Sequence, residues 1–193
     1  MIRSFIAITI PCAIQTAIAD QTASLRNAFG KPVVSWVPSQ NIHLTMKFLG
    51  DISSEHLDSL VRELTAEVLH HEVFSFSVGG NGVFPNVKRP RVVWIGIDTP
   101  QALMDLYQHV EDIADRSGYP KEQRLFSPHL TIGRVNQHLS NSEADVLGKA
   151  LAQFKVGKLG TVTVDSLQVF KSDLKPTGAV YTNLHTIHLA RSS

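Results

Sequence analysis

The tripeptide His-Leu-Thr occurs twice in this chain, at residues 43–45 and 129–131. At both places apolar and polar residues alternate, and a period of two predicts a β-strand. Alternation puts the histidine and threonine of each copy on one face of its strand and the leucine on the other. A single pair of this kind is usually an ordinary polar face of a strand. Two copies in matching contexts indicate a shared role.

The elements predicted around the two copies follow the same order: strand, helix, connector, His-Leu-Thr strand, helix, strand. Helices are predicted where apolar residues recur at spacings of three and four. The predicted strands cover residues 2–10, 42–48, 74–78, 92–97, 129–132, 162–170 and 180–189. The predicted helices cover residues 14–29, 57–68, 103–113 and 143–154. The segment Gly79-Gly80-Asn81-Gly82 is typical of a turn.

This repetition predicts an internal duplication within a single domain that spans residues 1–193. The two lobes are expected at roughly 1–80 and 91–170, followed by C-terminal strands. Two units are too few for a stacked solenoid. The simplest packing relates the lobes by an approximate two-fold axis, so that the two polar faces meet across a cleft.

Composition limits the possible partners. The net charge of +1 gives no global field for nucleic acid, so any anion must be bound locally. The single cysteine, Cys12, cannot form an internal disulfide, which fits a reducing compartment, and we expect a cytoplasmic protein. Residues 3–19 superficially resemble a secretion signal, but Pro11 interrupts the apolar run and cleavage would remove a strand that the duplication needs. No stretch approaches the roughly 20 apolar residues of a membrane span.

Two facing histidines suit acid–base chemistry. Because histidine titrates near pH ~6.5, one of His43 and His129 can be neutral while the other is protonated. One then acts as base and the other as acid. The hydroxyls of Thr45 and Thr131 lie on the same faces and can donate hydrogen bonds to an anion such as phosphate. A phosphodiester, particularly a strained cyclic one, would need no cofactor. These residues alone do not say which histidine is the acid.

Phe48 and Arg134 each lie five residues after a motif histidine. Strict alternation places both on the opposite face, which predicts a core position for Phe48 and a solvent position for Arg134. A bulge permitted by Gly133 would instead turn Arg134 to the motif face. A ring and a guanidinium at equivalent positions could then hold a nucleobase between them. The basic loop of Lys88, Arg89 and Arg91 either steers RNA phosphates or is simply solvated.

The two motifs, HLTM and HLTI, resemble the His-x-Thr-x motifs of the 2H phosphoesterase superfamily. The surroundings resemble its RNA 2′,3′-cyclic phosphodiesterase family, also described as 2′-5′ RNA ligase-like. The stretches that carry the resemblance are FIA at 5–7, WVPSQNIHLTMKFLG at 36–50, GVFP at 82–85, RVVWIG at 91–96, FSPHLTIGR at 126–134 and the region of Tyr181.

The resemblance implies an α+β bilobal fold in which two antiparallel sheets line a central cleft and the helices lie outside. It implies metal-independent opening of RNA 2′,3′-cyclic phosphate ends to leave a 2′-phosphate. In that family the first motif histidine is the proton donor and the second the acceptor, which here are His43 and His129. The expected partners are RNA ends or nucleotides that carry this phosphate. We further expect a monomer without cofactor, metal or membrane contact.

The residues also leave three other functions open. The reverse reaction would make the protein a 2′-5′ RNA ligase. A non-catalytic RNA-end-binding protein would keep the basic loop but would not need both histidines. A metallohydrolase fits poorly, because the two motifs supply no carboxylate and too few ligands for a catalytic zinc site.

Overall fold

The computed structural model describes residues 1–176 and 178–190. In these ranges the strands are β1 Ile2–Thr9, β2 Val34–Trp36, β3 His43–Ile52, β4 Phe74–Phe84, β5 Val92–Ile97, β6 His129–Val135, β7 Lys158–Val164, β8 Ser166–Lys175 and β9 Gly178–His188. The helices are α1 Cys12–Ala28, α2 Ser54–Val68, α3 Gln101–Arg116, α4 Asn141–Gln153 and the short 3-10 helix η1 Ser39–Asn41.

The strands lie in one path, in the order β7-β4-β5-β6-β3-β1-β8-β9, and β2 pairs with β6. All neighbours in this path are antiparallel. The central strands β3 and β6 meet at a single residue pair, Leu44 opposite Leu130. This narrow join separates two antiparallel sheets, as the resemblance implied. Each sheet also takes strands from the other half of the chain, since β4 pairs with β5 and β7, while β8 pairs with β1.

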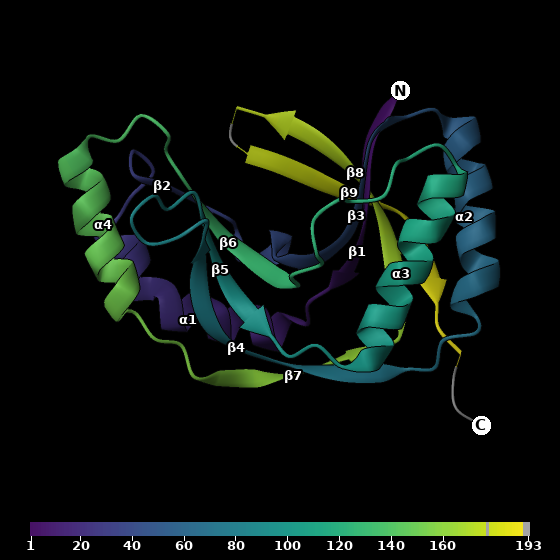
Figure 1. The fold of residues 1–193 in the computed structure, drawn as a ribbon, viewed down its shortest axis with the longest axis horizontal. Coiled ribbons are helices and arrows are strands. Elements are labelled where there is room, and N and C mark those ends of the chain that lie inside the picture. The colour runs from purple at the N-terminus through teal and green to yellow at the C-terminus, as the bar shows by residue number, and fades with distance from the viewer. Residues whose placement is uncertain (177, 191–193) are drawn as a thin grey trace.

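The helices lie outside the sheets, at the two ends of the molecule. Figure 1 shows α1 and α4 at one end and α2 and α3 at the other, so each end combines one helix from each half of the chain. This arrangement fits the predicted approximate two-fold duplication. The lobe boundaries at 1–80 and 91–170 stay a prediction.

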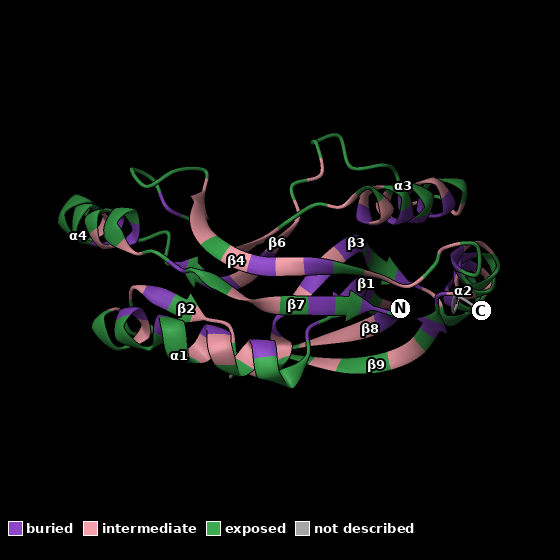
Figure 2. Ribbon diagram, turned by 90° about the horizontal axis from the view of Figure 1, so that it is seen from below, coloured by how far each residue is buried: buried purple, intermediate pink, exposed green. Residues whose placement is uncertain are grey.

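The helices α2 and α3 bury the apolar stripes that their sequences predict. In α2 the buried residues follow one another at spacings of three and four; they are Leu57, Leu60, Leu64 and Val68. In α3 the stripe includes Leu103, Leu106, Val110 and Ile113. Burying a side chain of this size contributes roughly 1.5–3 kcal/mol. Figure 2 shows that the buried residues gather on the strands and on the helix faces turned toward them.

Local signals fix several helix ends. The Ser53 hydroxyl accepts a hydrogen bond from the His56 backbone N–H at the start of α2. Before α4, Ser140 and Glu143 form a capping box, in which each side chain accepts from the backbone N–H of the other residue. Pro11 and Pro100 occupy the N-cap positions of α1 and α3.

The glycine-rich segment 79–82 was predicted as a turn, and that prediction is wrong because the segment lies inside β4. The pairing of β4 with β5 shifts register between Val78 and Asn81, which marks a bulge, and Gly80 has a φ of 70°. At Gly82, a Cβ would lie 2.2 Å from the ring of Trp94. The glycines therefore allow a bulge and a close approach of an indole ring, where the sequence suggested a change of chain direction.

The N-terminal strand β1 is central, since it pairs with β3 on one side and β8 on the other. Within the described residues, no helix has both the length and the apolar character needed to cross a bilayer.

Candidate active site

The two His-Leu-Thr motifs meet at the join between the sheets. Leu44 and Leu130 lie opposite each other and are 1% and 0% exposed, so they mark the core side of β3 and β6. Residues on either side of them face the other way. The polar residues of both motifs therefore share one face, and all four are partly exposed; they are His43, Thr45, His129 and Thr131.

Both motif histidines make the same backbone hydrogen bond. The Nδ1 of His43 lies 2.7 Å from the carbonyl oxygen of Asn41, and the Nδ1 of His129 lies 2.7 Å from that of Ser127. Because a carbonyl only accepts, each Nδ1 must carry a proton and donate it. In the neutral ring Nε2 is then the free base, and in the charged ring it is the free acid. The backbone thus leaves the same nitrogen, Nε2, available in both rings.

Aromatic rings surround the two histidines. The ring of Phe5 stacks on His43 at 4.8 Å between centroids, and the ring of Tyr181 meets His43 edge-on at 5.3 Å. The ring of Phe84 meets His129 edge-on at 4.9 Å, and Trp94 lies 6.4 Å from it. Both imidazoles therefore have aromatic rings as neighbours.

The pKa of His43 is lowered from its ordinary value. Burial is the largest cause, because the charged ring loses hydration, and the positive charge of Arg134 lowers it further. The hydrogen bond to the Asn41 carbonyl acts in the opposite direction and raises the pKa.

A β-bulge turns Phe48 to the motif face. On β1, Ala7 pairs with Thr45 and Phe5 pairs with Phe48, while Met46 is the extra residue. Since Phe5 and Ala7 are two positions apart, they share a face, and so do their partners. Phe48 is 66% exposed. The core position that strict alternation predicted for Phe48 is therefore wrong.

A matching bulge turns Arg134 to the same face. On β5, Trp94 pairs with Thr131 and Val92 pairs with Arg134, while Ile132 is the extra residue. This is the bulge that Gly133 suggested, displaced by one position, and Arg134 is exposed. The two bulges fall three residues after each motif histidine, so the duplication extends to the irregularities of the strands.

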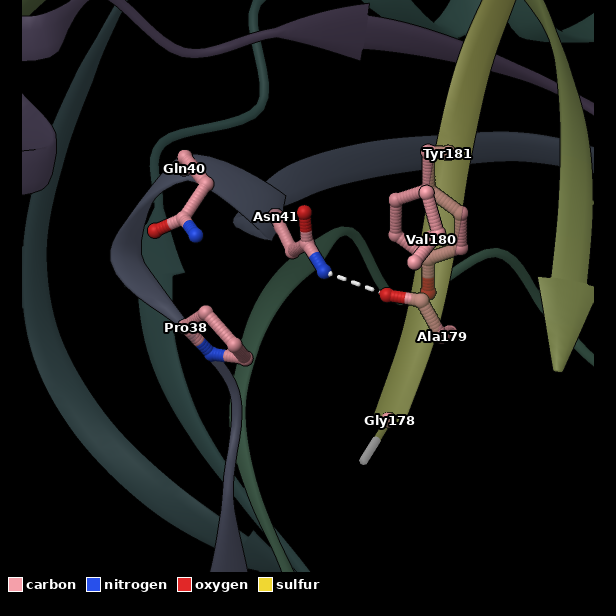
Figure 3. A pocket seen from close by; sticks show the side chains of 7 residues that line it. All are labelled: Pro38, Gln40, Asn41, Gly178, Ala179, Val180 and Tyr181. Atoms are coloured by element: carbon pink, nitrogen blue, oxygen red, sulfur yellow. Dashed lines mark hydrogen bonds between the residues drawn. The ribbon is translucent and has the colours of Figure 1, made fainter. Parts of the chain in front are cut away.

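A pocket of about 330 Å³ adjoins the first motif (Figure 3). It lies between η1 and the start of β9, where the side-chain Nδ2 of Asn41 donates to the carbonyl oxygen of Ala179 at 2.9 Å. The described lining residues are Pro38, Gln40, Asn41, Gly178, Ala179, Val180 and Tyr181. None of them carries a formal charge. The pocket therefore offers a neutral surface beside His43, and the donors for an anion lie on the motif face.

The basic loop follows β4. Lys88, Arg89 and Arg91 are exposed in the connection between β4 and β5. This loop approaches α4, because a Cβ on Gly148 would come within 2.4 Å of the Val87 carbonyl oxygen. In the described part of the chain, no group of three or more His, Cys, Asp or Glu side chains is placed to hold a metal ion.

Sequence reasoning assigned no role to the rings around the histidines. Phe5, Phe84, Trp94 and Tyr181 all lie in the stretches that carry the family resemblance, and that was the only signal for them. Their contacts with the histidines depend on strand pairing between distant segments, which local pattern does not reveal.

The comparisons with known proteins identify the family. The sequence model described as LigT like Phosphoesterase matches the chain twice, at residues 8–94 and 95–181. The chain belongs to the LigT-like phosphoesterase family. This confirms the predicted membership of the 2H superfamily, and it makes the protein an enzyme of the phosphodiesterase class, as predicted. The two matches also agree with the predicted duplication.

Similar proteins of the family cover nearly the whole chain. A protein of Thermotoga maritima named RNA 2′,3′-cyclic phosphodiesterase is 31% identical, over 95% of this chain and 93% of its own. One of Methanothermobacter thermautotrophicus with the same name is 28% identical, over 97% and 99%. Among solved structures, Escherichia coli LigT complexed with 3′-AMP has a TM-score of 0.75 and 25% identity, over 97% of this chain and 98% of its own.

Proposed function

We propose that this phosphoesterase opens 2′,3′-cyclic phosphates at RNA ends to leave a 2′-phosphate, without a metal ion. Its relatives carry the name RNA 2′,3′-cyclic phosphodiesterase, and the similar E. coli structure contains 3′-AMP. The observation that carries the proposal is the identical preparation of His43 and His129, each with Nδ1 bound to a carbonyl and Nε2 free.

The reaction would use these two nitrogens in one displacement. Neutral His129 takes a proton from water through Nε2 as the water oxygen attacks phosphorus. The bond from phosphorus to the 3′-oxygen breaks, and protonated His43 gives its Nε2 proton to that oxygen. The hydroxyls of Thr45 and Thr131 donate hydrogen bonds to the non-bridging oxygens. Each proton transfer contributes typically ~10²–10⁴-fold to the rate.

The donor role of His43 follows from the family resemblance. In the free protein its lowered pKa favours the neutral ring, which works against this role. A phosphate anion on the motif face would raise that pKa again, because it favours the charged imidazolium. We therefore expect His43 to become protonated as substrate binds.

Phe48 and Arg134 would bind the nucleotide that carries the phosphate. Both reach the motif face through the matching bulges, and Arg134 lies close enough to His43 for its charge to lower the histidine pKa. A ring and a guanidinium in these positions can enclose a nucleobase.

The first test is turnover of an oligonucleotide with a 2′,3′-cyclic end in the presence of chelator, with the product identified. We expect activity to persist and the phosphate to stay on the 2′-oxygen, because acid, base and anion donors are all protein groups. Activity that disappears in chelator and returns with one metal ion would contradict the metal-independent mechanism. A 3′-phosphate product would show that the leaving oxygen has been misassigned.

The second test concerns the two histidines as a unit. His43→Ala and His129→Ala should each lower kcat on the order of 10²-fold or more, and the double variant should be far less impaired than the product of the two. The pH profile should lose its alkaline limb in His43→Ala if His43 is the donor. His138→Ala is the matched control, since His138 is exposed after β6, and it should keep wild-type activity. A folded His43→Ala or His129→Ala variant with near wild-type turnover would refute the mechanism.

A further inference from the structure

A buried ion pair joins the first motif strand to α3. The Nζ of Lys47, on β3, lies 2.8 Å from Oε2 of Glu111, on α3, and the two side chains are only 6% and 4% exposed. Replacing a buried pair by apolar residues of similar size is often neutral or stabilising. The pair therefore calls for an explanation other than stability.

Both partners also hold the connector that leads to the second motif. Lys47 Nζ donates to the carbonyl oxygen of Pro120 at 2.6 Å, and the Glu122 backbone N–H donates to Glu111 Oε2 at 2.8 Å. The connector, residues 117–128, contains no helix or strand. These two bonds hold the connector at residues 120 and 122.

The second half of the connector is held by the same helix face. Tyr107 lies one turn before Glu111 on α3, and its ring stacks on Phe126 with 3.7 Å between centroids and 6° between planes. The next residue, Ser127, supplies the carbonyl oxygen that accepts from Nδ1 of His129. The ion pair and the stacked rings therefore fix the backbone group that orients the second histidine.

The equivalent connector before His43 is held differently. Arg26 of α1 donates through Nη1 to the carbonyl oxygen of Val37 at 3.2 Å, and Trp36 donates through Nε1 to that of Phe29 at 2.6 Å. All of these residues belong to the same half of the chain as His43. Both connectors are also tied to the opposite half of the chain. The first is tied through the pairing of β2 with β6, and the second through Lys47, which lies four residues after His43.

We propose that Lys47 and Glu111 are positioning residues that fix the second connector against the first motif strand and so orient His129 on the motif face. This inference rests on the proposed function for its effect on turnover. Its structural part, the orientation and tautomer of His129, is independent of the substrate.

The test uses the double variant Lys47→Met/Glu111→Leu. Removing both charges together leaves no unpaired buried charge, so this variant is expected to fold. It lacks the bonds to Pro120 and Glu122, so the connector should loosen. We expect kcat to fall on the order of 10- to 100-fold, as a small misplacement of a catalytic group does. KM should change by less than about threefold, because the proposed substrate-binding residues remain in place.

The matched control is the double variant Asp112→Asn/Lys121→Met. Asp112 and Lys121 also form an ion pair between α3 and the same connector, but their side chains are 33% and 48% exposed and they do not reach β3. An exposed pair of this kind contributes little. The control should keep wild-type kcat and KM.

A second readout is independent of activity. Nitrogen-15 NMR should find His129 as the Nδ1–H tautomer in the wild-type and control proteins, and as a mixture in Lys47→Met/Glu111→Leu, while His43 stays unchanged. A folded double variant with wild-type kcat and an unmixed His129 tautomer would overturn the inference. If wild-type protein fails to open a cyclic phosphate, the proposed function falls, and the NMR result still decides whether the pair positions His129.

Discussion

At the scale of single residues, the two motif histidines are alike in their hydrogen bonds and unlike in their surroundings. Each donates through Nδ1 to the carbonyl two residues earlier. His43 lies between the rings of Phe5 and Tyr181, and burial together with the charge of Arg134 lowers its pKa. In the free protein this shift favours the neutral ring of His43.

Arg134→Ala should raise the pKa of His43, because it removes a positive charge that disfavours the imidazolium. The pKa should remain below its ordinary value, since burial is the larger cause. An NMR titration of His43 measures the change. In kinetics, KM should rise more than kcat falls if Arg134 holds the nucleotide and takes no part in proton transfer.

Arg89→Ala is the control for this change. Arg89 is an exposed cation in the connection between β4 and β5, and its charge does not contribute to the lowered pKa of His43. It should leave both the His43 pKa and KM unchanged. If the pKa of His43 is unaltered in Arg134→Ala, the guanidinium of Arg134 does not act on His43. Arg134 would then point to solvent, as strict alternation predicts.

At the scale of elements, irregularities in the strands build the site. The extra residues Met46 and Ile132 turn Phe48 and Arg134 to the motif face. A third irregularity, in β4, lies beside the ring of Trp94, which in turn lies near His129. The glycines of β4 therefore affect the second histidine through packing.

Gly82→Ala should destabilise the protein by about 1–3 kcal/mol, the usual effect of overpacking. The added Cβ would lie 2.2 Å from the Trp94 ring, so the indole must move. Urea unfolding measures the decrease in the free energy of unfolding.

Gly157→Ala is the matched control, because no atom lies within 4 Å of its Cβ position. It should be neutral or stabilise by about 0.4–1 kcal/mol. Equal stability of the two variants would contradict the close packing of Trp94 on β4.

At the scale of the whole molecule, the fold joins two antiparallel sheets at one residue pair and exchanges strands between the halves of the chain.

Two histidines with lowered pKa values lie in different parts of this structure. His43 is at the join, and His71 follows α2, where its Nε2 lies 2.7 Å from Nδ1 of His109. Burial is the main cause of both shifts, and the charge of His109 adds to the second. The monomeric state and the cytoplasmic location remain predictions.

The free energy of unfolding should fall as the pH is lowered below about 6.5. A histidine with a lowered pKa in the folded state binds fewer protons there than in the unfolded chain, so stability rises with pH across this range. Urea unfolding at about pH 7.5 and about pH 5.5 measures the effect; carboxylates, which titrate near ~4, stay ionised at both. In His43→Gln and His71→Gln, the free energy of unfolding should each time decrease less between the two pH values than in the wild-type protein. Stability that increases on acidification would contradict the direction of both shifts.

The sequence by itself determined what depends on local pattern. The period-two alternation around the repeated tripeptide gave the faces of β3 and β6, and spacings of three and four gave the buried stripes of the helices. The pair His43 and His129 followed from the repetition, because equivalent positions in a duplicated fold meet near its two-fold axis. The glycines at 79–82 were misread, since the same residues permit a turn or a bulge.

Only the tertiary structure decided what depends on pairing between distant segments. The register of Leu44 with Leu130 set the shared face, and the bulges of β3 and β6 became visible only against their partners β1 and β5. The pair of Lys47 and Glu111 had no sequence signal, because its partners are 64 residues apart on different elements. The local sequence pattern indicates which face of a strand or helix is apolar. Long-range hydrogen bonds and packing determine which other element lies against each face.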